Sequence, residues 1–90
     1  MFSLFGTSFL KQDTTVDESA LQNLDLIGLY FSALWCGPCR YFTPQLSKFY
    51  QQVNQDRKKF EIFFVSKDHN KEEFLSYYKH MPFLSIPFDD

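Results

Sequence analysis

Two cysteines separated by two residues follow directly after an apolar run, and this arrangement restricts the chain more than any other feature. The segment Trp35-Cys36-Gly37-Pro38-Cys39-Arg40 contains both cysteines of the chain. Two intervening residues place the sulfur atoms close enough to form a disulfide within one helical turn. The spacing therefore predicts a thiol-disulfide exchange site at the start of a helix.

The two cysteines are expected to have different roles. Cys36 should lie at the helix N-terminus, where unpaired backbone N–H groups and the helix dipole favour a thiolate over a thiol. Cys39 lies one turn further into the helix and should be more buried. Cys36 is thus the predicted nucleophile. Cys39 is the predicted resolving thiol, which attacks the mixed disulfide and releases the reduced substrate.

Four neighbours of the cysteines are expected to shape the approach of a substrate. Gly37 presents no Cβ to an incoming disulfide, and the φ angle of Pro38 is already close to the helical value. Trp35 offers a flat apolar surface beside the reacting sulfur, with packing in the core as the alternative. Arg40 either stabilises the thiolate electrostatically or binds an acidic patch on a partner, and a solvated charge is equally consistent with the sequence.

Other uses of the cysteine pair fit the sequence less well. A zinc site usually needs four ligands, and the two histidines, His69 and His80, lie eleven residues apart, which matches no common zinc finger. A purely structural disulfide across so short a loop would remove little entropy from the unfolded chain. We therefore predict redox chemistry without a metal or an organic cofactor. The histidines should be solvated, and Asp68 is either a turn residue or a group that approaches the active site.

Length and composition indicate one small globular domain, residues 1–90. Aromatic residues make up 20% of the chain, with twelve Phe and five Tyr, and large rings help a short chain to build a core. The net charge of −2 and the lack of a basic run argue against a nucleic-acid surface.

The sequence also favours a particular compartment. Residues 1–10 are mildly apolar but lack the basic start and sustained apolar core of a signal peptide. No apolar run reaches the length of a membrane span. Because both cysteines belong to the redox motif, a reducing compartment is expected, either the cytoplasm or the nucleus.

The first half of the chain is predicted to form an edge strand, a short helix and a central strand. The edge strand should lie within residues 1–15, with Phe5, Phe9 and Leu10 as its apolar contacts. Acidic residues at 17 and 18 suggest a short helix that starts near Thr15, with Ala20, Leu21 and Leu24 on one side. Residues 26–34 are almost continuously apolar or small, which predicts a central parallel strand covered on both faces.

The second half is predicted to continue as helix, strand and helix. From Cys39, apolar residues recur every three or four positions and indicate a helix bent by Pro44: Phe42, Leu46, Phe49, Tyr50 and Val53. Residues 60–66 should form a second buried strand, which completes a right-handed β-α-β unit. Asn70 and Glu73 suggest a capped helix that ends at Pro82 and buries one face, formed by Phe74, Leu75, Tyr78 and Met81.

With these residues in hand, the chain resembles the tryparedoxin and nucleoredoxin branch of the thioredoxin superfamily. The matching segments are residues 28–33, the motif at 35–40, Phe42-Thr43-Pro44 with Leu46 and Phe49-Tyr50, residues 81–84 and Pro87-Phe88. The resemblance implies an α/β, thioredoxin-like three-layer fold, a central sheet with helices on both faces. It also implies a protein-disulfide reductase. Electrons would come from a dithiol donor such as trypanothione, glutathione or a reductase, and would pass to a protein disulfide such as that of a peroxidase.

The chain departs from the resembled family in three ways. Gly37-Pro38 replaces the common Pro-Pro pair, and Tyr30 stands where thioredoxins proper carry a buried aspartate, so Tyr30 is expected to pack in the core. The family also continues into two further strands, a helix and a cis-proline turn, which Ile86-Pro87 resembles only superficially. The fold is therefore expected to be C-terminally truncated, and this favours an alternative function. In that alternative the chain is a redox-weak interaction module that binds through an exposed edge or a Phe-rich face.

Overall fold

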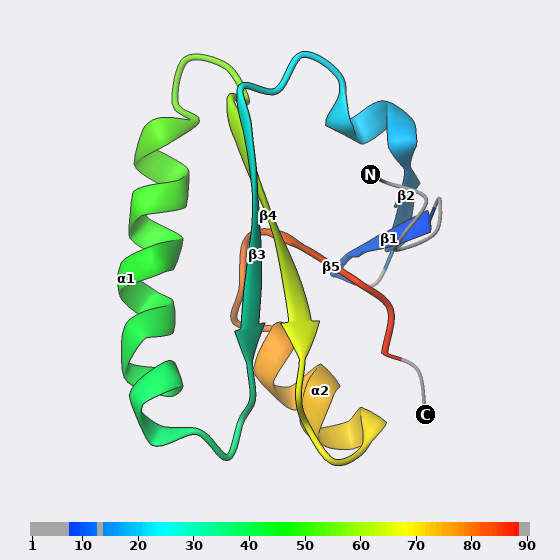
Figure 1. The fold of residues 1–90 in the computed structure, drawn as a ribbon, viewed down its shortest axis with the longest axis vertical. Helices are drawn as coiled ribbons and strands as arrows, with labels where there is room; N and C mark the ends of the chain where they lie inside the picture. The colour runs from blue at the N-terminus through cyan, green and yellow to red at the C-terminus, as the bar shows by residue number, and fades with distance from the viewer. Residues whose placement is uncertain (1–7, 13, 89–90) are drawn as a thin grey trace.

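A five-stranded mixed sheet forms the centre of the computed structural model, which describes residues 8–12 and 14–88 (Figure 1). The strand order is β2-β1-β5-β4-β3, with β3, β4 and β5 parallel and β1 antiparallel to β2 and β5. The predicted α/β arrangement is confirmed. In chain order the elements are β1 (Ser8–Lys11), β2 (Thr14–Asp17), the 3₁₀ helix η2 (Glu18–Leu21), β3 (Leu26–Ser32), α1 (Gly37–Val53), β4 (Phe60–Ser66), α2 (Lys71–Tyr78) and β5 (Leu84–Ser85).

The predicted β-α-β unit is present, but its first strand is not central. β3 and β4 pair in parallel along their whole length, and α1 connects them. Within the described residues β3 pairs only with β4 and so ends the sheet. The expectation of a strand covered on both faces is wrong, since Leu26, Leu29 and Phe31 are 66%, 46% and 55% exposed.

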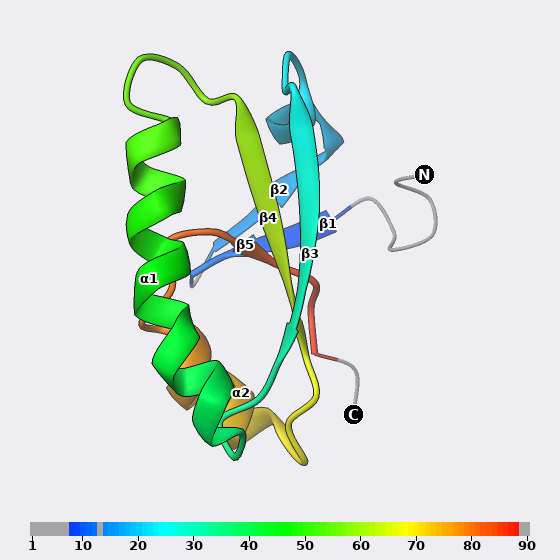
Figure 2. The same cartoon turned by 60° about the vertical axis from the view of Figure 1, so that its left-hand side comes forward.

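The two long helices lie on the same face of the sheet (Figures 1 and 2). On that face, both helices pack on β4 in one core cluster. Its members include Tyr50 of α1, Ile62 and Phe64 of β4, and Phe74, Tyr77 and Tyr78 of α2. On the opposite face, Leu21 of η2 packs in a second cluster that includes Phe9 and Phe63. Helical structure lies on both faces as predicted, but two α helices cover one face and only the short η2 lies on the other.

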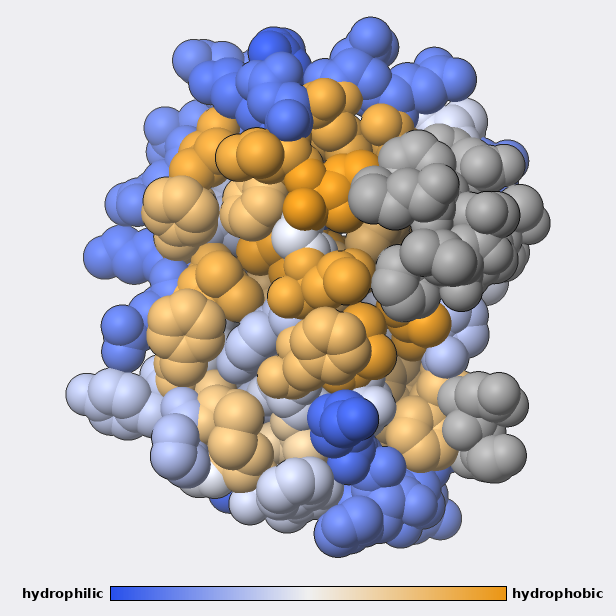
Figure 3. All heavy atoms as spheres, in the orientation of Figure 1, coloured by the Kyte–Doolittle hydropathy of each residue, from blue (hydrophilic) through white to orange (hydrophobic). Residues whose placement is uncertain are grey.

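The face without α helices is strongly apolar. Figure 3 shows a broad apolar area on this side, across the middle of the molecule. Leu29 and Phe31 alternate with Tyr30 along β3, and alternate side chains of a strand point to opposite faces. Tyr30 belongs to the cluster beneath the helices, so Leu29 and Phe31 point to the other face. Much of that face of β3 is therefore in contact with solvent.

The N-terminal segment is a hairpin, where the sequence suggested one edge strand followed by a helix near Thr15. Phe9 pairs with Val16, and Thr15 also belongs to β2. The helix begins only at Glu18, and the side chain of Asp17 caps it by accepting a hydrogen bond from the Ser19 N–H at 2.9 Å. Hydrogen bonds from Ser19 also lower the pKa of Asp17. Phe5 lies outside the described residues.

The helix after the cysteines is continuous through its internal proline, as predicted. Pro44 lies inside α1, and Figure 2 shows the N-terminal part of the helix leaning away from the axis of the rest. Tyr50 is buried, whereas Phe42 and Phe49 of the predicted apolar stripe are 47% and 52% exposed. The buried side of the helix is therefore narrower than the apolar stripe predicted from the sequence.

The second helix is capped as predicted and ends earlier than expected. The Asn70 side chain accepts a hydrogen bond from the Glu73 N–H at 2.9 Å. The Glu73 carboxylate accepts one from the His69 N–H, one residue before the position of a capping box. The helix stops at Tyr78, ahead of Pro82, and Tyr77 is buried in place of Leu75.

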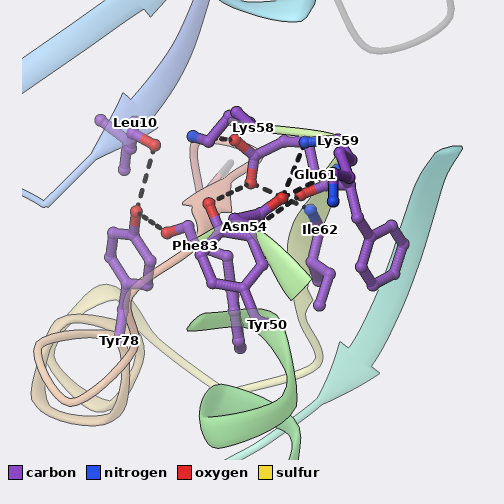
Figure 4. A network of polar contacts seen from close by, with 10 residues as sticks. Leu10, Tyr50, Asn54, Lys58, Lys59, Glu61, Ile62, Tyr78 and Phe83 are labelled. Atoms are coloured by element: carbon purple, nitrogen blue, oxygen red, sulfur yellow. Dashed lines mark hydrogen bonds and ion pairs between the residues drawn. The ribbon is translucent and has the colours of Figure 1, made fainter. Parts of the chain in front are cut away.

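Polar groups buried beneath the helices are satisfied within the chain (Figure 4). The fully buried Glu61 carboxylate accepts a hydrogen bond from the Tyr50 hydroxyl at 2.9 Å and pairs with the Lys58 ammonium at 2.6 Å. The Tyr78 hydroxyl lies 2.7 Å from the carbonyl oxygen of Phe83 and 3.1 Å from that of Leu10. Burial raises the pKa of Tyr78 to about 12. Tyr78 thus ties α2 to β1 and to the chain just before β5.

Candidate active site

Cys36 and Cys39 lie at the N-terminus of α1, just beyond the carboxyl end of β3. They form a disulfide with a Cα–Cα distance of 5.2 Å. Cys36 is the N-cap of α1, and its sulfur accepts a hydrogen bond from the Cys39 N–H at 3.3 Å. Both cysteines are half-buried. A backbone donor aimed at the Cys36 sulfur is the arrangement that stabilises a thiolate when the pair is reduced.

The residues between and after the cysteines leave the motif open to solvent. Gly37 and Pro38 are exposed, and a Cβ placed on Gly37 would meet no heavy atom within 4 Å. The Arg40 N–H donates to the Cys36 carbonyl oxygen at 3.0 Å. The Arg40 side chain is exposed and forms no ion pair with any described residue. A substrate chain can therefore approach the disulfide from the side of Gly37 and Pro38.

Trp35 forms a surface beside the motif together with a histidine. It is 57% exposed, which excludes the alternative of core packing. Its indole N–H donates to the Lys67 carbonyl oxygen at 3.2 Å. Its ring stacks on the His69 imidazole with centroids 5.5 Å apart and planes inclined by 6°. His69, expected to be merely solvated, thus belongs to the surface next to the cysteines.

Asp68 fixes the turn that leads from β3 into the motif. Its side chain is buried, and its carboxylate accepts hydrogen bonds from the Leu34 N–H at 2.7 Å and from the Ser66 hydroxyl at 2.5 Å. The sequence left open whether Asp68 is a turn residue or approaches the active site. It reaches the turn immediately before Trp35 and acts on the site through the backbone.

A chain of hydroxyl groups lies beneath Cys39. The Tyr30 hydroxyl lies 3.1 Å from the Cys39 carbonyl oxygen and 2.7 Å from the Thr43 hydroxyl. Thr43 in turn contacts the Tyr77 hydroxyl at 2.7 Å, and Tyr77 contacts the Ser32 hydroxyl at 2.8 Å. Burial raises the pKa of Tyr77, so its hydroxyl remains protonated. Tyr30 was expected only to pack in the core, and sequence reasoning missed this network.

The other titratable residues do not cluster as metal ligands in the described part of the chain. Within the described residues, no three His, Cys, Asp or Glu side chains gather as they would around a metal ion. His80 is exposed just after α2. Neither α helix in the described part of the chain is long and apolar enough to cross a membrane.

Comparisons with known proteins agree with this geometry. The thioredoxin-like family model matches residues 23–90. A tryparedoxin from Trypanosoma brucei brucei is 51% identical over 84 residues, which are 93% of this chain and 57% of that protein. A nucleoredoxin from Danio rerio is 45% identical over 76 residues, 84% of this chain and 18% of that protein. A thioredoxin structure from Wuchereria bancrofti superposes with a TM-score of 0.84 at 43% identity, covering 97% of this chain and 62% of that one.

The chain thus spans less than two thirds of each of these proteins. The matched region contains the cysteine motif, α1, β4 and α2. The family match and the superposition on the thioredoxin structure together confirm the resemblance drawn from the sequence. The chain belongs to the thioredoxin-like family and is similar to its tryparedoxins and nucleoredoxins.

Proposed function

We propose that the chain is a thiol-disulfide oxidoreductase that reduces disulfides in proteins. One observation carries the proposal: Cys36 and Cys39 form a disulfide at the N-terminus of α1, with Cys36 as the N-cap. The similarity to tryparedoxins and nucleoredoxins supports the same function. Residues 1–90 act as one unit in this proposal.

The reaction follows from the placement of the two sulfur atoms. In the reduced chain the Cys36 thiolate attacks a substrate disulfide, forms a mixed disulfide and expels one substrate thiolate. Cys39 loses its proton and attacks the Cys36 sulfur, and the second substrate thiolate leaves. The substrate gains two electrons and two protons, and the chain becomes the disulfide form observed here. No metal or organic cofactor is required, because the two cysteines carry the electrons.

The neighbouring residues have supporting roles. Trp35 provides a flat surface for the substrate, and the open space at Gly37 and Pro38 admits its disulfide. Arg40 is a positive charge on the rim of the site. Asp68 is a positioning residue, because it holds the turn that precedes Trp35.

A dithiol or thiol of the glutathione type is the proposed electron donor. A tryparedoxin II solved in complex with glutathionylspermidine is 35% identical and covers 99% of this chain, with a TM-score of 0.83. The proposed acceptor is a protein disulfide such as that of a peroxidase. A cytoplasmic or nuclear location is consistent with a chain whose two cysteines both belong to the redox motif.

Reduction of insulin disulfides in the presence of dithiothreitol tests the proposal. We expect the wild-type chain to accelerate insulin precipitation, and Cys36→Ser to abolish the acceleration because the nucleophile is lost. Gln45→Ala, at an exposed position of the same helix, is a control. A folded wild-type chain, as judged by circular dichroism, that gives no acceleration over dithiothreitol alone would refute the proposed activity.

One observation favours a second function, self-association through the free edge of β3. Within the described residues the outer edge of β3 has no partner, and the strand contains neither charged residues nor proline. Two copies could pair antiparallel through this edge about a two-fold axis at Leu29. Leu29 would then face Leu29 of the second copy, and Ile27 would face its Phe31, so apolar side chains would pair across the interface.

Sedimentation velocity tests this second function. Leu29→Lys brings two like charges together at the axis and should convert a dimer into a monomer. Leu75→Lys is the matched control, because Leu75 is 48% exposed on α2. A wild-type chain that remains monomeric at high concentration would exclude self-association through β3.

A further inference from the structure

A groove of about 960 Å³ separates α1 from α2 on the helical side of the molecule. The two helices lie beside each other in both ribbon views (Figures 1 and 2). Arg40 and Lys48 line the groove from α1, and Lys79 and His80 line it from the end of α2. Buried Tyr77 is among the other lining residues. The groove is therefore a feature of the same face that buries the core beneath the helices.

The groove has a charge opposite to that of the chain. The chain contains eleven acidic and nine basic residues and has a net charge of −2. No Asp or Glu lines the groove, whereas three of the nine basic residues do: Arg40, Lys48 and Lys79. All three side chains are exposed, and none forms an ion pair with a described residue. Unneutralised cations along one groove create a local positive potential that attracts an anionic ligand.

The spacing of the cations indicates an extended ligand. Arg40 and Lys48 are eight residues apart on one helix, which corresponds to roughly 12 Å along its axis. A single phosphate or sulfate ion cannot span that distance. An extended peptide covers it with about four residues, at roughly 3.3 Å for each residue. Nucleic acid is disfavoured, since no Phe or Trp lines the groove among the described residues, and the lining Tyr77 is buried and offers no face for stacking.

The groove adjoins the cysteine motif. Leu34 and Arg40, which flank the segment from Trp35 to Cys39, both line it. When the disulfide of a substrate protein contacts Cys36, the substrate residues next to that disulfide therefore lie at the mouth of the groove. We propose that the groove between α1 and α2 binds an acidic segment of the protein whose disulfide is exchanged at Cys36. This inference rests on the proposed oxidoreductase function and specifies the class of its substrate.

Two synthetic peptides, each closed by one disulfide, test the proposal on the full chain. One carries an Asp-rich flank beside the disulfide, and its twin carries Asn at the same positions. The variant Lys48→Glu/Lys79→Glu reverses two groove charges. Lys71→Glu, at an exposed residue that does not line the groove, controls for a charge reversal outside the groove. The measured quantity is the ratio of kcat/KM for the acidic peptide to kcat/KM for the neutral one.

We expect the wild-type chain to prefer the acidic peptide. The double variant should lower the ratio roughly tenfold, or about 1.4 kcal/mol, because it reverses two exposed charges that would pair with the acidic flank. The preference should weaken as salt is raised, and Lys71→Glu should retain it. Equal reduction of both peptides by the wild type, or an unchanged ratio in the double variant, would overturn the groove proposal. If neither peptide is reduced, the oxidoreductase function itself fails.

Discussion

Removal of the Asp68 carboxylate should destabilise the turn that carries the cysteine motif. The side chain is buried, and it accepts hydrogen bonds from the Leu34 N–H at 2.7 Å and from the Ser66 hydroxyl at 2.5 Å. Asp68→Ala leaves both donors without this acceptor, at a cost of about 1–3 kcal/mol. We expect a loss of about 2 kcal/mol in the free energy of unfolding, which for a chain of this length lowers Tm by roughly 8–16 °C.

Urea unfolding followed by Trp35 emission and by far-UV circular dichroism measures this loss. Trp35 is the one tryptophan of the chain and adjoins the turn, so its emission reports the region directly. Asp68→Asn keeps an oxygen acceptor at nearly the same place and should cost about 1 kcal/mol or less. Asp56→Ala, an exposed carboxylate in the connection after α1, should change little. If Asp68→Ala were as stable as Asp56→Ala, the inferred role of Asp68 would be wrong.

Two further perturbations test other parts of the structure. His69→Ala removes the ring stacked on Trp35 and should lower the fluorescence anisotropy of Trp35 in the folded chain, whereas His80→Ala should not; equal anisotropy in both variants would contradict the stack. Burial raises the pKa of Tyr78 from its ordinary value of 10.0 to about 12 in the folded chain. Its contribution to stability is therefore complete below pH 10 and is lost as the pH rises towards 12. Alkaline urea titrations should therefore show stability falling by up to about 3 kcal/mol over that range, and an equally steep fall in Tyr78→Phe would refute the assignment.

The elements that the sequence predicted well are those with a strong local signal. The bounds of β4 match the apolar run at 60–66, and Asn70 caps α2 as its spacing from Glu73 indicated. The disulfide and the N-cap position of Cys36 follow from the two-residue spacing, because short-range geometry alone decides them. Local rules thus predicted the geometry of the motif.

The wrong predictions concern neighbours in space. An apolar run reports the hydropathy of a strand and carries no information on its partners. The run at 26–34 therefore predicts a central strand, whereas β3 lies at the edge of the sheet formed by the described residues. The acidic residues after Val16 indicated an earlier helix start, but pairing with β1 keeps Thr15 and Val16 extended. In that segment, strand pairing between β1 and β2 outweighs the weak helix propensity of the sequence.

The residues that follow a second strand were only partly anticipated from the sequence: the role of Asp68 was left open, and the contact of His69 with Trp35 was missed. Asp68 and His69 follow β4 and lie 29 to 33 positions after the cysteines, yet both reach the segment around Trp35. The carboxyl ends of parallel strands meet at the same edge of a sheet, and this rule could have placed both residues beside the motif. No comparable rule brings together the hydroxyls of Tyr30, Thr43 and Tyr77, whose meeting depends on how α1 and α2 pack.

Trapping of the mixed disulfide tests the central claim most directly. Each of Cys36→Ser and Cys39→Ser is incubated with a protein disulfide substrate, and intact mass spectrometry measures the covalent adduct. If Cys36 is the nucleophile and Cys39 the resolving thiol, Cys39→Ser accumulates an adduct through Cys36, and Cys36→Ser accumulates little. Equal adduct in the two variants, or none in either folded variant, would contradict the assignment of the two cysteines.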